Sequence, residues 1–184
     1  RLSLVGSEMC IRDSRYLGLD INRQNLDDLK QAEAHLAKVR PFIRYFDNDR
    51  NLSDLANGNT CLAIAWNGNV AIVAAQAEQA NKDFQLSYRI PREGALLWFD
   101  AMVIPRDAPH PEAGLALMNH LMTPEVIGAI SNSIYYANTV PAADAFVDPA
   151  LLAAPGTYPP AELRATLYAK NDNSREFNLS LIHI

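Results

Sequence analysis

Two long apolar runs, the second of which carries a single aspartate, constrain the fold of this chain more than any other feature of its sequence. CLAIAW occupies residues 61–66, and ALLWFDAMVI occupies residues 95–104. Continuous apolar runs bounded by turn residues are typical of strands buried on both faces of a parallel sheet. The alternating segments FIRYF (42–46) and FQLSYRI (84–90) are also expected to be strands.

Helix-forming segments lie between and after these predicted strands. Asn25 is expected to cap the first helix, and Gly58 is suited to the position just after the second. The predicted helices cover residues 25–39, 51–57, 70–82, 110–122, 123–130 and 161–170. Strands that alternate with helices indicate an α/β fold with parallel or mixed strands.

Charge and composition exclude several classes of function. The 184 residues carry a net charge of −5, and the Lys and Arg residues are scattered. This pattern argues against binding to nucleic acid or to an anionic membrane surface, and it is compatible with a cationic ligand. No apolar run approaches the roughly 18 residues of a membrane span. The two cysteines, Cys10 and Cys61, form no metal-binding pattern, and Cys61 is expected in the core.

Asp100 is the most unusual residue of the second apolar run. In a strand, alternate side chains share a face, so Trp98 and Asp100 are expected to point the same way. A carboxylate among apolar residues is costly unless a cation or several hydrogen-bond donors satisfy it. One interpretation is a structural carboxylate paired with an arginine or with backbone N–H groups. The other is a binding site for a positively charged ligand.

Aromatic side chains at two other places would complete such a site. Trp66 ends the first apolar run and Asn69 follows three residues later, at a strand end where α/β sheets bind ligands. Asn69 could equally be a simple helix cap. Tyr135 and Tyr136 precede a turn, and one of them is expected to face a cleft or solvent. Aromatic rings around a carboxylate are suited to holding an ammonium group.

Enzymatic and metal sites have weaker support. His110 and His120 lie ten residues apart without a metal-binding spacing, and the chain has no nucleophile-elbow, P-loop or Rossmann glycine motif. A hydrolase using Asp100 with one of these histidines therefore remains a minor alternative. We expect no metal and no cofactor.

Five segments together resemble the periplasmic polyamine-binding proteins, the putrescine and spermidine receptors of bacterial ABC importers. They are RPFIRYF, DLANGNTCLAIAWNGNV, IPREGALLWFDAMVIP, LMTPEVIGAISNSIYYAN and TYPPAELRATLY. The likeness runs from about residue 16 to about residue 178 and is closer to the putrescine-type branch. It implies a non-enzymatic, periplasmic receptor of the type II periplasmic-binding-protein-like fold, with two lobes that close on a polyamine and engage a membrane permease.

The resemblance also assigns roles to residues. Trp66 and Trp98 would be aromatic walls, Asp100 the ammonium-binding carboxylate and Tyr136 a further contact. Asn69 stands where putrescine-type members place an aspartate, which weakens one anchor for a short dication. The ligand is therefore expected to be putrescine, spermidine or a related amine.

The resemblance further divides the chain into parts. Residues 15–92 would belong to the second lobe, 93–138 to the first lobe with hinge crossings at both ends, and 139–178 to the second lobe again. The family's signal peptide and most of its first lobe would be missing, so a fragment that binds nothing by itself is an alternative. Residues 1–14 and 179–184 resemble translated sequencing adapter and are expected to be non-native.

Overall fold

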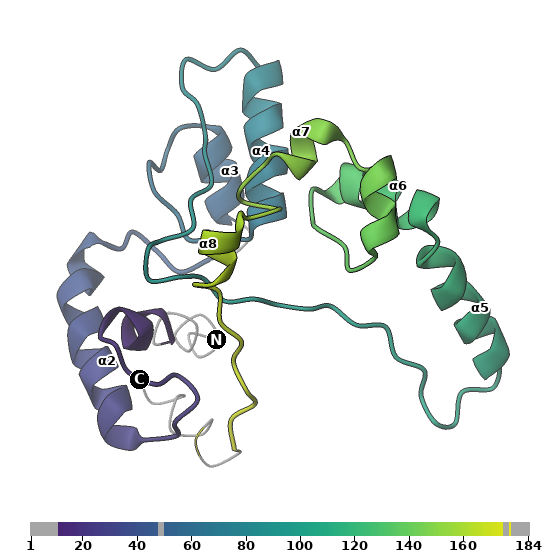
Figure 1. The fold of residues 1–184 in the computed structure, drawn as a ribbon. Coiled ribbons are helices and arrows are strands. Elements are labelled where there is room, and N and C mark those ends of the chain that lie inside the picture. The colour runs from purple at the N-terminus through teal and green to yellow at the C-terminus, as the bar shows by residue number, and fades with distance from the viewer. Residues whose placement is uncertain (1–10, 48–49, 175–176, 178–184) are drawn as a thin grey trace. The chain divides into compact units, whose positions relative to one another are not determined.

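The computed structural model describes residues 11–47, 50–174 and 177, which form two compact units (Figure 1). The first unit takes its residues from 1–48, 91–97 and 166–184, and the second from 49–90 and 98–165. Most of the predicted non-native segments therefore lie outside the described residues. In the described part of the chain, no helix is long and apolar enough to cross a membrane.

Helix α2 (Leu26–Val39) is the main element of the first unit and confirms the helix predicted there. The side chain of Asn25 caps it by accepting a hydrogen bond from the Asp27 N–H at 2.8 Å. Leu29 and Ala32 form its buried face. The 3-10 helix η1 (Arg40–Phe42) follows at once, and residues 43–46 form no strand, so the strand predicted over FIRYF is wrong.

Helices α3 (Arg50–Ala56) and α4 (Asn67–Gln79) form the core of the second unit by packing side by side (Figure 1). Leu55 of α3 is buried, as are Val70, Val73 and Ala77 of α4. The three α4 residues recur at the spacing that places side chains on one helix face. Both predicted helices are thus confirmed, and the second begins three residues earlier than expected.

Further helices of the second unit follow the second apolar run. They are α5 (Pro111–Leu121), α6 (Pro124–Ile134), η2 (Pro141–Phe146), α7 (Pro149–Leu152) and α8 (Ala161–Arg164). Helix α6 packs on η2, where Gly128 admits the Cβ and backbone of Phe146. The predicted helices over 110–122 and 123–130 are confirmed, but the last helix ends at Arg164 rather than at residue 170.

The predicted sheet does not form within the described residues. Their β pairing is a single parallel bridge between Leu96 and Tyr168, in the first unit. Residues 61–66, 84–90 and 98–104 have no strand assignment. Leu62 is 87% exposed and Val103 is 82% exposed, which contradicts the buried strands expected over both apolar runs.

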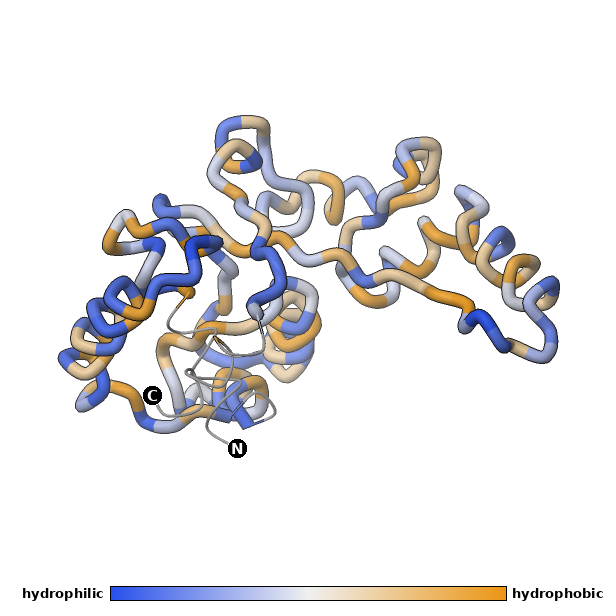
Figure 2. The backbone as a smooth tube through the Cα atoms, turned by 90° about the horizontal axis from the view of Figure 1, so that it is seen from below, coloured by the Kyte–Doolittle hydropathy of each residue, from blue (hydrophilic) through white to orange (hydrophobic). Residues whose placement is uncertain are grey.

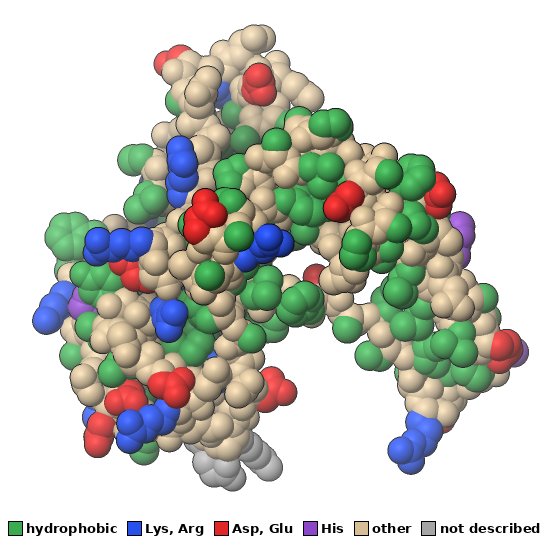
Figure 3. Space-filling view, viewed as in Figure 1, with side chains coloured by type: hydrophobic (Ala, Val, Ile, Leu, Met, Phe, Trp, Pro, Cys, Tyr) green, Lys and Arg blue, Asp and Glu red, His purple; other side chains and the backbone are tan. Residues whose placement is uncertain are grey.

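The reason for this difference is that a strand exists only where another strand completes its hydrogen bonds. An apolar run indicates that a segment is more stable when it is buried. The described part of the chain supplies no neighbouring strand against which these segments could pair. The segment that leads into α5 is accordingly apolar over much of its length (Figure 2), and its residues 98–104 belong to no sheet. Hydrophobic side chains also gather on the visible face of the region of α5 (Figure 3). Leu115 and Leu117 of this helix are exposed.

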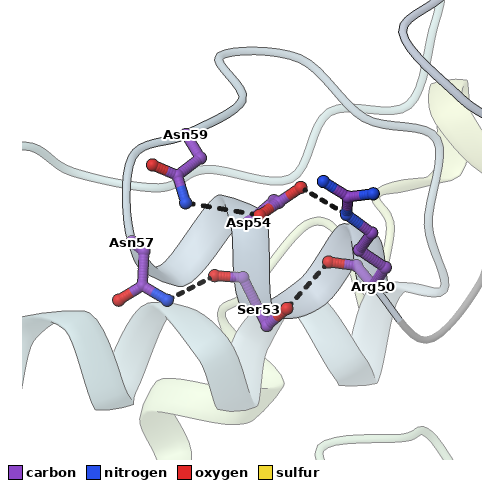
Figure 4. Close-up of polar contacts among 5 residues, drawn as sticks. All are labelled: Arg50, Ser53, Asp54, Asn57 and Asn59. Carbon is purple, nitrogen blue, oxygen red and sulfur yellow. Dashed lines mark hydrogen bonds and ion pairs between the residues drawn. The ribbon is translucent and has the colours of Figure 1, made fainter.

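A polar network fixes the end of α3 (Figure 4). Asp54, which is buried, accepts hydrogen bonds from Arg50 Nε and Asn59 Nδ2, both at 3.3 Å. The Asn57 amide donates to the Ser53 carbonyl at 2.9 Å. Gly58 then turns the chain with φ of 70°, the left-handed conformation expected of a residue after a helix. The network directs the chain toward the first apolar run.

Replacing Gly58 by Ala should lower the free energy of unfolding by about 1–2 kcal/mol, because the new Cβ disfavours a positive φ. That Cβ would also stand 2.9 Å from the Phe84 ring. Urea unfolding measures the loss. Gly18→Ala is the control, since Gly18 has φ of 73° and nothing within 4 Å. Equal losses in the two variants would show that Phe84 moves aside without cost.

Candidate functional site

The amino-terminal turn of α4 is the centre of the candidate site. The Asn51 amide donates to the Ile64 carbonyl at 3.2 Å and so ties the first apolar run to α3. Trp66 is the cap residue of α4, and its carbonyl accepts the Val70 N–H at 3.1 Å. Asn69 is therefore the third residue of the helix, and the interpretation of Asn69 as its cap is wrong. Trp66 and Asn69 lie at opposite ends of one helical turn.

Trp66 contacts Trp98, although the two residues are 32 positions apart in the sequence. Their ring centroids are 6.3 Å apart, and the ring planes are tilted by 57°. Trp66 is 39% exposed and Trp98 is 59% exposed. The pair thus presents two accessible aromatic faces, which a cation or an apolar chain can cover.

Tyr136 contacts Asn69, although 67 positions separate them in the sequence. Its hydroxyl donates to Asn69 Oδ1 at 3.3 Å. The turn that presents Tyr136 begins at Tyr135, which ends α6 in a left-handed conformation (φ 60°) and donates its N–H to the Ser131 carbonyl at 2.9 Å. Ser131 is 2% exposed and accepts the Asn138 amide at 3.0 Å. Hydrogen bonds to the buried Ser131 therefore hold this turn in place, and residues 135–138 have no strand assignment.

Asp100 lies within electrostatic range of Tyr136. Burial raises the pKa of the Tyr136 phenol, and the negative charge of Asp100 raises it further. Asp100 itself is exposed, and among the described residues no arginine, lysine or histidine forms an ion pair with it. This excludes, for the described part of the chain, the interpretation in which an arginine already neutralises the carboxylate.

Sequence reasoning missed Gly68, which lies between Trp66 and Asn69. A Cβ at this position would stand 2.6 Å from Cζ of Tyr136, and the ring atoms Cδ2 and Cε2 are nearer still. The NGN motif predicts a turn, and a turn glycine carries no expectation of an aromatic partner. A glycine inside a helical first turn, by contrast, signals that something approaches the backbone closely.

The side chains that could support catalysis or metal binding do not converge on this turn. His110 Nδ1 lies 3.5 Å from Glu112 at an exposed helix start, and His35 pairs with Asp13 in the other unit. No group of three or more metal-ligating side chains occurs in the described ranges. Cys61 is an exposed free thiol, so its predicted place in the core is wrong. What the site offers is aromatic surface, one amide and negative charge.

Comparisons with known proteins identify the family of the chain. Residues 12–160 match the family model described as bacterial extracellular solute-binding protein. The chain is 44% identical over 153 residues to the putrescine/agmatine-binding protein of Pseudomonas aeruginosa. The aligned residues cover 83% of this chain and 42% of that relative. The chain is 40% identical over 154 residues to a putrescine-binding periplasmic protein of Escherichia coli, covering 83% and 42%.

A more distant relative is the spermidine/putrescine-binding periplasmic protein of Escherichia coli. It is 28% identical over 148 residues, which cover 80% of this chain and 41% of the relative. The chain thus spans less than half the length of the curated relatives it matches.

Replacing Asp100 by Asn should lower the pKa of Tyr136, because a negative charge nearby disfavours the phenolate and its removal relieves that penalty. Phenolate absorbance followed against pH measures the effect, and the Tyr136→Phe variant identifies the contribution of Tyr136. Asp107→Asn is the control, since Asp107 is not among the groups that raise this pKa. An unchanged pKa in Asp100→Asn would place the carboxylate away from Tyr136.

Proposed function

The chain belongs to the bacterial extracellular solute-binding protein family, and on this premise we propose that it is part of a polyamine receptor. The proposed ligand is putrescine or a related polyamine, because the similar proteins are named for putrescine, agmatine and spermidine. The observation that supports it most directly is the meeting of Trp66, Trp98 and Tyr136 around one helical turn, with the charge of Asp100 close to Tyr136.

Each proposed residue has a role that follows from its chemistry. Asp100 binds one ammonium group by a charge-assisted hydrogen bond. Trp66 and Trp98 cover the methylenes and contribute cation–π attraction of about 0.5–2 kcal/mol for each contact. Tyr136 and Asn69 contact a second polar group of the ligand. These roles come from the resemblance and from the side-chain types together.

The amide at position 69 affects which amine the proposed site binds. An amide carries no net charge, so it attracts an ammonium group less strongly than a carboxylate does. A short diamine that needs two anionic contacts loses one of them at this position. The proposal therefore covers putrescine and also longer polyamines whose second ammonium binds elsewhere in the complete receptor.

The remaining features of the proposal follow from the family. The complete receptor has the two-lobed type II periplasmic-binding fold, lies in the periplasm and delivers its ligand to an ABC permease. Ligand binding shifts its lobes from open to closed, and the permease responds to the closed form. The lobe boundaries at residues 92–93 and 138–139 stay predictions. We propose no catalytic step, since among the residues that the structure describes no histidine forms an ion pair with Asp100.

Putrescine at millimolar concentration should raise the melting temperature of the 184-residue chain, because all five proposed residues belong to one compact unit. A ligand at ten times its Kd adds about 1.4 kcal/mol to the native state and raises the melting temperature by about 3 °C. The uncharged diol of the same carbon number is the control. No shift with either compound would favour the alternative that this chain alone binds nothing.

A hybrid receptor tests the assignment of Asp100 separately. Residues 12–160 would replace the matching segment of the Pseudomonas aeruginosa relative. In this hybrid, Asp100→Asn should weaken putrescine binding more than a hundredfold, because an enclosed ammonium group loses its counter-charge. Asp107→Asn should leave the affinity unchanged. Calorimetry that finds equal affinities in the two variants would refute the role of Asp100.

A further inference from the structure

Gly68 and Tyr136 fit together in a way that the proposed function does not explain. Gly68 is buried in the first turn of α4, and Tyr136 follows α6. A Cβ at Gly68 would stand 2.6 Å from Cζ of the ring, well below the 3.4–4 Å of an ordinary contact. The obstructing atoms belong to a ring whose turn is held at its backbone by the buried Ser131. Glycine is therefore the residue that allows Tyr136 to occupy this place.

The same contact fixes how the Tyr136 hydroxyl is used. A phenol has one O–H, which it can donate once, and it also has lone pairs that accept hydrogen bonds. The Tyr136 O–H is donated to Asn69 Oδ1 at 3.3 Å. The backbone N–H of Asn69 also acts on the phenol oxygen and lowers its pKa, so what the oxygen still offers a ligand is a remaining acceptor lone pair.

We propose that Gly68 is a positioning residue that seats Tyr136 with its phenol oxygen as an acceptor, and that the site therefore selects ammonium groups that retain an N–H. The inference rests on the proposed polyamine site and specifies its ligand class. Primary and secondary amines belong to this class, and quaternary ammonium ions do not.

The aromatic pair alone would not make this distinction. Cation–π attraction between Trp66, Trp98 and a ligand depends on positive charge, which a quaternary ammonium ion also carries. Asp100 attracts either cation through its charge, and it adds a hydrogen bond only to a cation that has an N–H. A phenol acceptor gains a hydrogen bond only when the cation has an N–H to donate, and it loses solvation without compensation when the cation has none.

The positioning role is tested without ligand, in the full 184-residue chain. Gly68→Ala should move the Tyr136 ring out of its half-buried place, so the raised pKa of Tyr136 should fall toward its ordinary value. Phenolate absorbance against pH measures this, with Tyr136→Phe as the reference. Gly114→Ala is the matched control, because Gly114 is also a helical glycine and its Cβ would meet only the flexible end of Ile104 at 3.0 Å.

A loss of folding in Gly68→Ala would still decide the question. Alanine is the better helix former, so the substitution should stabilise the chain if the ring did not interfere. The double variant Gly68→Ala/Tyr136→Ala removes the obstructing ring, and it should recover the far-UV circular dichroism and the melting transition. An unchanged Tyr136 pKa in Gly68→Ala, or a double variant that stays unfolded, would overturn the positioning role.

The selectivity is tested by comparing putrescine with its fully N-methylated bis-quaternary analogue in the same chain. Calorimetry or tryptophan fluorescence should give at least a tenfold preference for putrescine, and this preference should fall at least threefold in Tyr136→Phe and in Gly68→Ala. The Gly114→Ala variant should keep the full preference. Equal binding of both compounds by the unsubstituted chain would overturn the selectivity.

The experiments distinguish failure of the proposed function from failure of the positioning role of Gly68. If the chain binds neither compound, the selectivity claim for this chain fails together with the polyamine site. The ligand-free titration then still reports whether Gly68 positions Tyr136.

Discussion

The close approach of Tyr136 to the backbone at Gly68 is the constraint on which the arrangement of the site depends. It brings the turn after α6 to the first turn of α4, where the Tyr136 hydroxyl meets Asn69. The same helical turn begins at Trp66, which contacts Trp98. Residues from three distant parts of the sequence are thus assembled around a few backbone atoms, because one residue there has no side chain.

The helices could be predicted from the sequence because their signals are local. Asn25 caps α2, Gly58 turns the chain after α3, and prolines begin α5 and α6, all within a few residues of the feature they explain. The strands could not be predicted in the same way, since apolar character shows only that a segment requires burial. Whether residues 61–66 become a strand depends on a partner elsewhere, and the described chain holds none.

The candidate site shows the same division between local and distant information. Trp66, Trp98, Asp100 and Tyr136 stand out because aromatic and acidic side chains are unusual at those places in apolar segments. Gly68 does not, since its importance lies in a partner 68 residues away. The interpretation of Asn69 as a helix cap is wrong, because the cap is Trp66 and the Asn69 amide oxygen instead accepts the tyrosine hydroxyl. Contacts of this kind depend on tertiary structure.

The apolar segment of residues 98–104 has a practical consequence for handling this polypeptide. Phe99 and Val103 are exposed hydrophobic side chains in a segment without a strand assignment, and exposed apolar segments are places where protein chains associate. The chain carries one protective feature there, the charge of Asp100 in the middle of the run. A charged residue inside an apolar segment acts as a gatekeeper against aggregation, so the carboxylate that we propose as a ligand contact also opposes association of this segment.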